Sequence, residues 1–185
     1  MDNGAGSYHR FLQGDKSGLE ELVVQYNRPL IFFINKLVNN IAVSEDIAAD
    51  TFVELIAGKS RFQEGASFKT WLFRVARNNT IDYLRRQSRY TMRSLEESEA
   101  ELSDSVALES ALIQTEQKKQ LCQAMQNIPR AYSEVLHLLY FEEMSYDEAA
   151  KVLHKSNRQI KNLAYRGKKA LKSKLEKGGF VYEDG

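Results

Sequence analysis

The side chains that could do chemistry gather in two basic stretches. One, "SFKTWLFRVARNNTIDYLRRQ", covers residues 67–87 and interleaves arginines with aromatic residues, including the only tryptophan. The other, "SNRQIKNLAYRGKKALKSKLEK", covers residues 156–177. Between residues 151 and 177 ten Lys or Arg face a single glutamate, and between residues 61 and 93 eight face two acidic residues. In a chain whose net charge is only +1, this distribution predicts two separate contacts with nucleic acid.

Helical periodicity divides the second stretch into two faces. At about 100° per residue, one side is apolar and suited to packing: Ile160, Leu163, Ala164, Gly167 and Leu171. The other side carries cations, an amide and a tyrosine: Arg158, Lys161, Asn162, Tyr165, Arg166, Lys169 and Lys172. A short helix "SYDEAAKVL" and a tight turn "HKS" come before it, which predicts a helix-turn-helix whose second helix enters the DNA major groove. The alternative is a basic surface helix without a ligand.

The types of these side chains predict which of them would contact base edges and which would contact phosphate. Arg158, Asn162 and Arg166 can form paired hydrogen bonds with guanine or adenine edges. The lysines at positions 161, 169 and 172 are better suited to phosphate.

The first stretch divides in the same way. Its apolar side predicts burial of most of the helix: Phe68, Leu72, Phe73, Val75, Ala76, Tyr83 and Leu84. The remaining strip carries polar and basic side chains: Thr70, Arg74, Arg77, Asn78, Ile81 and Arg85, with Trp71 and Asp82 at its margin. Such a strip can follow a phosphate backbone and receive an unstacked base. Trp71 by itself fits core packing as well as base stacking, and both interpretations stay open.

The elements that position these stretches are predicted to be helices throughout. Apolar residues recur at intervals of three and four, and only two prolines interrupt the chain. The expected helices cover residues 18–38, 45–57, 67–87, 109–128, 130–143, 146–153 and 157–177. Their predicted N-caps are Ser17, Ser44, Ser145 and Ser156, with a break or kink near Asn27 caused by Pro29 and an end of the second helix at Gly58.

The composition predicts two small helical domains joined by a flexible acidic linker. Residues 91–116 carry seven acidic residues against one arginine, with several serines and little periodicity at first. We therefore place one domain at residues 1–90, the linker at 91–110 and the second domain at 111–185. The acidic character by itself is consistent with a plain solvated tether.

Other classes of site lack support in the sequence. Cys122 is the only cysteine, and the histidines at positions 9, 137 and 154 are too widely spaced for a metal cluster, so no metal and no cofactor is expected. The longest apolar run, "PLIFFI", is far too short for a bilayer span, and the polar start lacks the order of a signal peptide, which predicts a cytoplasmic protein without membrane insertion. No phosphate loop, nucleophile motif or carboxylate–histidine cluster suggests an enzyme.

Three blocks in this order resemble the extracytoplasmic-function class of bacterial sigma factors, which keep only regions two and four. They are "EDIAADTFVEL", "SFKTWLFRVARNNTIDYLRR" and "SYDEAAKVLHKSNRQIKNLAYRGKKAL". The resemblance implies that the chain binds core RNA polymerase, directs it to a promoter and helps to open the DNA, without catalysing a reaction. It also implies that an anti-sigma factor could cover the polymerase-binding faces.

The resemblance assigns roles residue by residue. It places polymerase binding at Asp46, Asp50, Thr51 and Phe52, although acidic residues near a helix N-terminus also occur for the sake of the helix dipole. It implies capture of a flipped base of the minus-ten element on the non-template strand by the loop "FQEGASF" with Asn78 and Asp82. Asp82, when ionised, can only accept hydrogen bonds, so it would prefer an exocyclic amine. We expect Trp71, Arg74, Arg77 and Arg85 to contribute to the same contact.

For the minus-thirty-five element the resemblance implies contacts from the helix at residues 157–175. The matching positions are Arg158, Lys161, Asn162, Tyr165 and Arg166, next to Lys169. Gly167 stands where relatives carry alanine, and a glycine inside a helix should weaken it by about 1 kcal/mol. The rival interpretations are a stand-alone helix-turn-helix regulator, which would bind duplex DNA specifically without polymerase, and an enzyme acting on nucleic acid.

Overall fold

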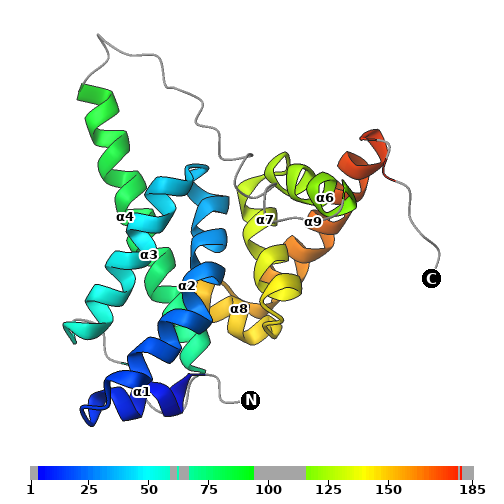
Figure 1. Cartoon of the computed structure of the whole chain (residues 1–185). Coiled ribbons are helices and arrows are strands. Elements are labelled where there is room, and N and C mark those ends of the chain that lie inside the picture. The colour runs from blue at the N-terminus through cyan, green and yellow to red at the C-terminus, as the bar shows by residue number, and fades with distance from the viewer. Residues whose placement is uncertain (1–3, 59–61, 63–66, 94–115, 179, 181–185) are drawn as a thin grey trace. The chain divides into compact units, whose positions relative to one another are not determined.

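The computed structural model describes residues 4–58, 62, 67–93, 116–178 and 180. All regular structure in these residues is helical, which confirms the predicted all-α class (Figure 1). The chain divides into two compact units, Met1–Leu102 with Lys151–Leu153, and Ser103–Ala150 with His154–Gly185. The predicted linker at 91–110 falls mostly on residues 94–115, outside the described part.

The first unit is built around a long helix. α2 (Lys16–Val38) packs against α1 (Ala5–Leu12), α3 (Ile41–Ile56) and α4 (Phe68–Arg93). It buries Leu22, Leu30 and Phe33 completely. The helix runs without interruption through Pro29, so the expected break near Asn27 does not occur. Packing on three neighbours holds together a helix that loses one backbone hydrogen bond at the proline.

Two predicted N-caps in the first unit are wrong. α2 is capped by Asp15, whose carboxylate accepts hydrogen bonds from the backbone N–H and the hydroxyl of Ser17. α3 is capped by Asn40, whose Oδ1 accepts from the Val43 N–H at 3.2 Å. Ser44 lies inside α3, fully buried, and its hydroxyl donates to the carbonyl oxygen of Asn40. Gly58, with a φ of 64°, follows the end of α3 as expected.

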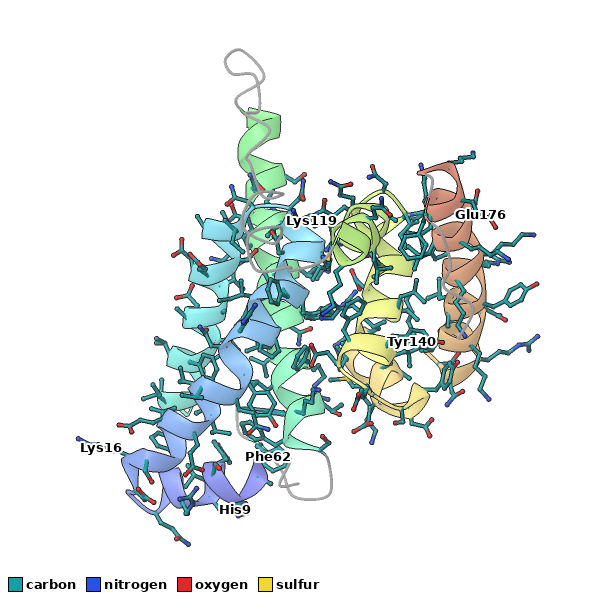
Figure 2. The ribbon with its side chains drawn as sticks, turned by 45° about the vertical axis from the view of Figure 1, so that its right-hand side comes forward. His9, Lys16, Phe62, Lys119, Tyr140 and Glu176 are labelled. Carbon is teal, nitrogen blue, oxygen red and sulfur yellow. The ribbon has the colours of Figure 1, made fainter. Side chains whose placement is uncertain are left out.

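An unpredicted helix, α1, closes one end of this unit. Gly18 of α2 lies so near it that a Cβ atom would approach the carbonyl oxygen of Ser7 to 2.2 Å. Tyr8 of α1 is buried, and its ring lies 5.3 Å from Phe68, 5.9 Å from Phe62 and 6.0 Å from Trp71 between centroids. Figure 2 labels Phe62 at this end of the unit. Aromatic packing therefore joins α1 to the start of α4.

The second unit contains α6 (Glu116–Gln126), α7 (Arg130–Leu136), a π-helical turn η1 (His137–Phe141), α8 (Tyr146–Leu153) up to Ala150, and α9 (Asn157–Lys177). Figure 1 shows α7 beside α9, and α6 packs against both. Met125, Ile128 and Leu136 form a buried cluster between these helices. The helix predicted at 130–143 thus ends two residues early and changes to π geometry in its second half.

Candidate nucleic-acid interfaces

Local hydrogen bonds hold the start of α8 and the turn between α8 and α9. Ser145 with Glu148 and Ser156 with Gln159 form complete capping boxes, which confirms both predicted caps. His154 ends α8 in the left-handed conformation at a φ of 52°. The capping boxes satisfy backbone N–H groups that have no partner within the first turn of a helix. Only three residues separate the end of α8 from the start of α9.

A hydrogen bond across this turn fixes the start of α9. The Asn157 amide donates to Oδ1 of Asp147 at 2.6 Å, linking the first residue of α9 to the first turn of α8. The predicted helix-turn-helix is therefore present in the second unit, with its second helix anchored at the end from which bases would be reached.

Burial along α9 follows the predicted division. Ile160 and Ala164 are buried, and Gly167 lies against α7, where a Cβ atom would meet Tyr132 Cβ and Leu136 Cγ at 3.2 Å each. Every member of the opposite stripe is exposed: Arg158, Lys161, Asn162, Tyr165, Arg166, Lys169 and Lys172. Tyr165 is 73% exposed, unusual for an aromatic side chain. We name these seven residues the α9 stripe.

Two lysines of α9 are directed to partners within the unit. Lys168 lies 5.1 Å from the ring centroid of Tyr140, labelled in Figure 2, and a hydrogen bond with the Tyr140 hydroxyl raises the pKa of Lys168. Lys172 lies 3.8 Å from the carboxylate of Glu176. An exposed pair of this kind is weak and would exchange readily for a phosphate.

The exposed strip of α4 is narrower than the projection predicts. Arg74, Asn78, Asp82 and Arg85 are exposed, while Arg77 is half-buried. We name these five residues the α4 strip. Its single carboxylate, that of Asp82, lies 3.4 Å from a guanidinium nitrogen of Arg85, so the strip presents arginines and an amide with a partly neutralised acid.

Two residues placed on or beside this strip are buried. Thr70 is only 3% exposed, which corrects its placement on the strip. Trp71 is 6% exposed, and its ring centroid lies 5.4 Å from that of Phe68 and 5.9 Å from that of Phe62. For Trp71 the projection fails because it contains no information on where Tyr8 of α1 lies against the helix. Of the two open interpretations for Trp71, core packing is the one that matches its surroundings.

The residues expected to bind polymerase fall into two groups on α3. Asp46 and Asp50 are exposed, whereas Thr51 and Phe52 are buried. The Thr51 hydroxyl donates to the carbonyl oxygen of Ile47 at 2.8 Å. Only the two aspartates can therefore touch a partner directly in this conformation, and Thr51 and Phe52 would act by shaping the helix.

One polar contact between α3 and α4 was not anticipated from the sequence. The amide of Asn79 donates to Oε2 of Glu54 at 3.0 Å and to Oγ1 of Thr51 at 3.3 Å. The sequence does contain a signal for this contact, since Asn79 directly follows Asn78. Its side chain lies about 100° from that of Asn78 around the helix, at the edge of the α4 strip.

Other kinds of site find no support in the described part of the chain. It contains no cluster of three or more His, Cys, Asp or Glu side chains that could hold a metal ion. None of its helices has both the length and the hydropathy that a membrane crossing requires.

Family models match both units. One, described as Sigma-70 region 2, matches residues 22–90, and another, described as Sigma-70, region 4, matches residues 118–171. The chain is 26% identical over 171 residues to the ECF RNA polymerase sigma factor SigW of Bacillus subtilis, which covers 88% of this chain and 91% of SigW. It is also 26% identical over 163 residues to the RNA polymerase sigma factor YlaC of the same organism, and the match covers 88% of this chain and 94% of YlaC.

Solved structures share the fold. The sigma factor RpoE, solved in complex with the anti-sigma factor NepR from Bartonella quintana, matches with a TM-score of 0.68 at 21% identity over 87% of this chain and 98% of RpoE. CnrH, solved in complex with the cytosolic domain of CnrY, matches with a TM-score of 0.65 at 21% identity over 94% and 95% of the two chains. Since both sigma-70 regions match in order and the relatives align over most of their length, the chain belongs to the extracytoplasmic-function class of the sigma-70 family of RNA polymerase sigma factors.

Proposed function

We propose that three surfaces of this sigma factor divide the work of promoter recognition. The α9 stripe reads the minus-thirty-five element in duplex DNA, the α4 strip holds melted minus-ten DNA, and the exposed acidic face of α3 docks on core RNA polymerase. The observation that carries the proposal is the separation of faces: on both α4 and α9, most of the basic and amide side chains are exposed while the opposite side is buried.

The chain serves transcription initiation and is not an enzyme, in keeping with its family. The site of action that follows from the proposal is the cytoplasm, where polymerase and promoter DNA meet. The complex of RpoE with the anti-sigma factor NepR and the complex of CnrH with the cytosolic domain of CnrY support a partner of similar kind for this chain. Such a partner would compete with core polymerase for the acidic face of α3.

The α9 stripe has the chemistry for both kinds of DNA contact. Arg158 and Arg166 can each donate two hydrogen bonds to a guanine edge, and Asn162 can pair with adenine. Lys161 and Lys169 suit phosphate, where they add affinity but no sequence preference. The exposed ring of Tyr165 offers apolar surface to a thymine methyl group.

The α4 strip has the chemistry for a single strand. Arg74, Arg77 and Arg85 can follow the backbone, while Asn78 can donate to and accept from the edge of an unstacked base. Asp82 can accept from an exocyclic amine once Arg85 turns to phosphate, because their exposed ion pair is weak.

The test combines purified chain with core polymerase and a set of candidate promoters. We expect pull-down of the polymerase and promoter-specific initiation. Arg166→Ala should weaken binding to promoters by about 1–3 kcal/mol, through the minus-thirty-five element, while polymerase binding is retained. Lys174→Ala is the matched control, because it removes a charge from the same helix outside the stripe.

Two results would contradict the proposal. If the wild-type chain neither binds polymerase nor confers specific initiation, the assignment of surfaces fails as a whole. If it binds the same duplex sites with equal specificity in the absence of polymerase, the regulator interpretation is favoured instead.

A further inference from the structure

We propose that Asn79 is a positioning residue that ties the α4 strip to the polymerase-facing side of α3, so that its amide is needed for promoter opening but not for polymerase binding. The inference rests on the proposed function of these two surfaces. Its carrying observation is the pair of hydrogen bonds by which one amide nitrogen on α4 reaches both Glu54 and Thr51 on α3.

The side chain between Thr51 and Glu54 must donate two hydrogen bonds, because both of these groups act as acceptors. The Thr51 hydroxyl already gives its hydrogen to the carbonyl oxygen of Ile47, so it can only accept. The Glu54 carboxylate, when ionised, also only accepts. A single NH₂ group with two hydrogens satisfies both, and its orientation is therefore fixed by its partners. A leucine of similar size would leave the buried Thr51 oxygen and the half-buried carboxylate without this donor.

The position of the contact connects the two proposed surfaces. Glu54 follows Asp46 and Asp50 at intervals of four residues, so the three carboxylates lie along one side of α3. Asn79 directly follows Asn78, the exposed amide of the α4 strip. Polymerase docked on Asp46 and Asp50 would thus hold α3 beside Glu54, the next carboxylate in the row. Glu54 is hydrogen-bonded to Asn79 of α4, which is adjacent in sequence to Asn78, the amide proposed to capture a base.

Promoter opening places a demand on this contact that docking does not. Holding a base out of the duplex must offset the loss of its stacking and pairing. The strip can supply that only if its side chains are held in place relative to the polymerase, since an error of about 1 Å in position can reduce a rate by a hundredfold. Docking through Asp46 and Asp50 involves α3 alone and should not depend on Asn79.

The experiment uses holoenzymes made with wild-type chain, Asn79→Leu and Asn79→Asp. Three quantities are measured: affinity for core polymerase, the unfolding midpoint, and opening of a promoter that carries a fluorescent base analogue in its minus-ten segment. We expect both variants to reduce opening by about tenfold or more, with unchanged affinity for polymerase. Asn79→Asp should be the more severe because it places a second carboxylate next to Glu54.

Thr80→Val is the matched control. It removes a buried hydroxyl from the adjacent residue, but that hydroxyl donates to the carbonyl oxygen of Ala76 in the same helix, at 2.7 Å, and makes no link to α3. It should lower the unfolding midpoint and leave opening intact. Adding Glu54→Gln to Asn79→Asp should restore much of the opening, because the new amide can donate to the new carboxylate.

Three outcomes would overturn the inference. Opening could be normal in Asn79→Leu, polymerase affinity could fall in proportion to opening, or Thr80→Val could impair opening as much as Asn79→Leu at an equal loss of stability. The last two would assign Asn79 a purely structural role. Failure of the wild-type chain to open any promoter would instead refute the proposed function, so the two failures can be told apart.

Discussion

The contact between α1 and α2 gives the sharpest stability prediction, for Gly18→Ala. The added methyl group would lie 2.2 Å from the carbonyl oxygen of Ser7 and 2.9 Å from the backbone nitrogen of Phe11. Both atoms belong to the α1 backbone, so no side-chain rotation can relieve the clash. An ordinary contact requires α1 to move away by about 1 Å.

The expected loss in the free energy of unfolding follows from the contacts that α1 makes when it packs against α2. Its movement disturbs the burial of Tyr8, worth about 2 kcal/mol, and the hydrogen bond from Ser7 to Glu21. Alanine gains at most about 1 kcal/mol over glycine as a helix former. The expected net loss is about 1–3 kcal/mol in the free energy of unfolding of the first unit.

The assay is urea unfolding followed by tryptophan fluorescence. Trp71 is the only tryptophan in the chain, lies in the first unit and is 6.0 Å from the Tyr8 ring, so its signal reports on this unit alone. Displacement of α1 should also change the emission of the folded protein. Gly14→Ala is the control: its φ of 95° is strained for alanine but nothing lies within 4 Å, so it should lose stability without altering the folded emission.

An unchanged or higher unfolding midpoint for Gly18→Ala would refute the close approach of the two helices. So would a folded-state emission spectrum identical to that of the wild type.

Two further predictions concern single side chains. Hydrogen bonds from Ser7 and then from Arg10 lower the pKa of Glu21, so its contribution to stability is present above the ordinary glutamate pKa and is lost as the pH falls through the lowered value. The stability difference between wild type and Glu21→Gln, measured by urea unfolding, should therefore be largest near neutral pH and shrink in the acid range; a constant difference would contradict the sign. Ser156→Ala should lower the free energy of unfolding of the second unit by about 0.5–2 kcal/mol, because it opens the capping box of α9. Calorimetry should show this loss in the second unit only, and Ser173→Ala, at an exposed position of the same helix, should be near neutral.

Caps could be predicted where the local signal had no competitor. Ser145 and Ser156 each follow a turn and precede a glutamate or glutamine at the third helical position, and both predicted caps are confirmed. Ser17 has a similar pattern with Glu20, but Asp15 stands two residues earlier and accepts from Ser17 itself. The prediction at Ser44 is wrong because α3 begins earlier, at Ile41 after the N-cap Asn40, and Ser44 is buried inside the helix.

The helix α1 could not be predicted from local propensity. It has eight residues, and an isolated helix of that length is marginal in water. Its stability comes from contacts distant in sequence, of Tyr8 with Phe68 and of the Ser7 backbone with Gly18. The same limit applies to Asn79, since periodicity gives the angle of a side chain around its helix but not the neighbouring helix it meets.

Gly167 shows how a sequence expectation can be right about the residue and incomplete about its effect. Glycine weakens the isolated helix, yet here its missing side chain lets α7 approach, because a Cβ atom would be 3.2 Å from both Tyr132 and Leu136. The close approach and the intrinsic penalty therefore oppose each other. α9 is held against α7 by packing at a point where its own propensity is weakest.

The partners of the α9 cations indicate which part of the helix is available for DNA. Lys168 is directed to Tyr140, and Lys172 lies beside Glu176, so two of the cations after Gly167 already have contacts within the unit. Arg158 and Arg166 are exposed and have no hydrogen-bond or ion-pair partner among the described residues. Their guanidinium groups can therefore approach DNA without first breaking an internal contact. Under the proposed function, we therefore expect the N-terminal half of α9 to read DNA, the half that the Ser156 capping box and the Asn157–Asp147 hydrogen bond hold in place.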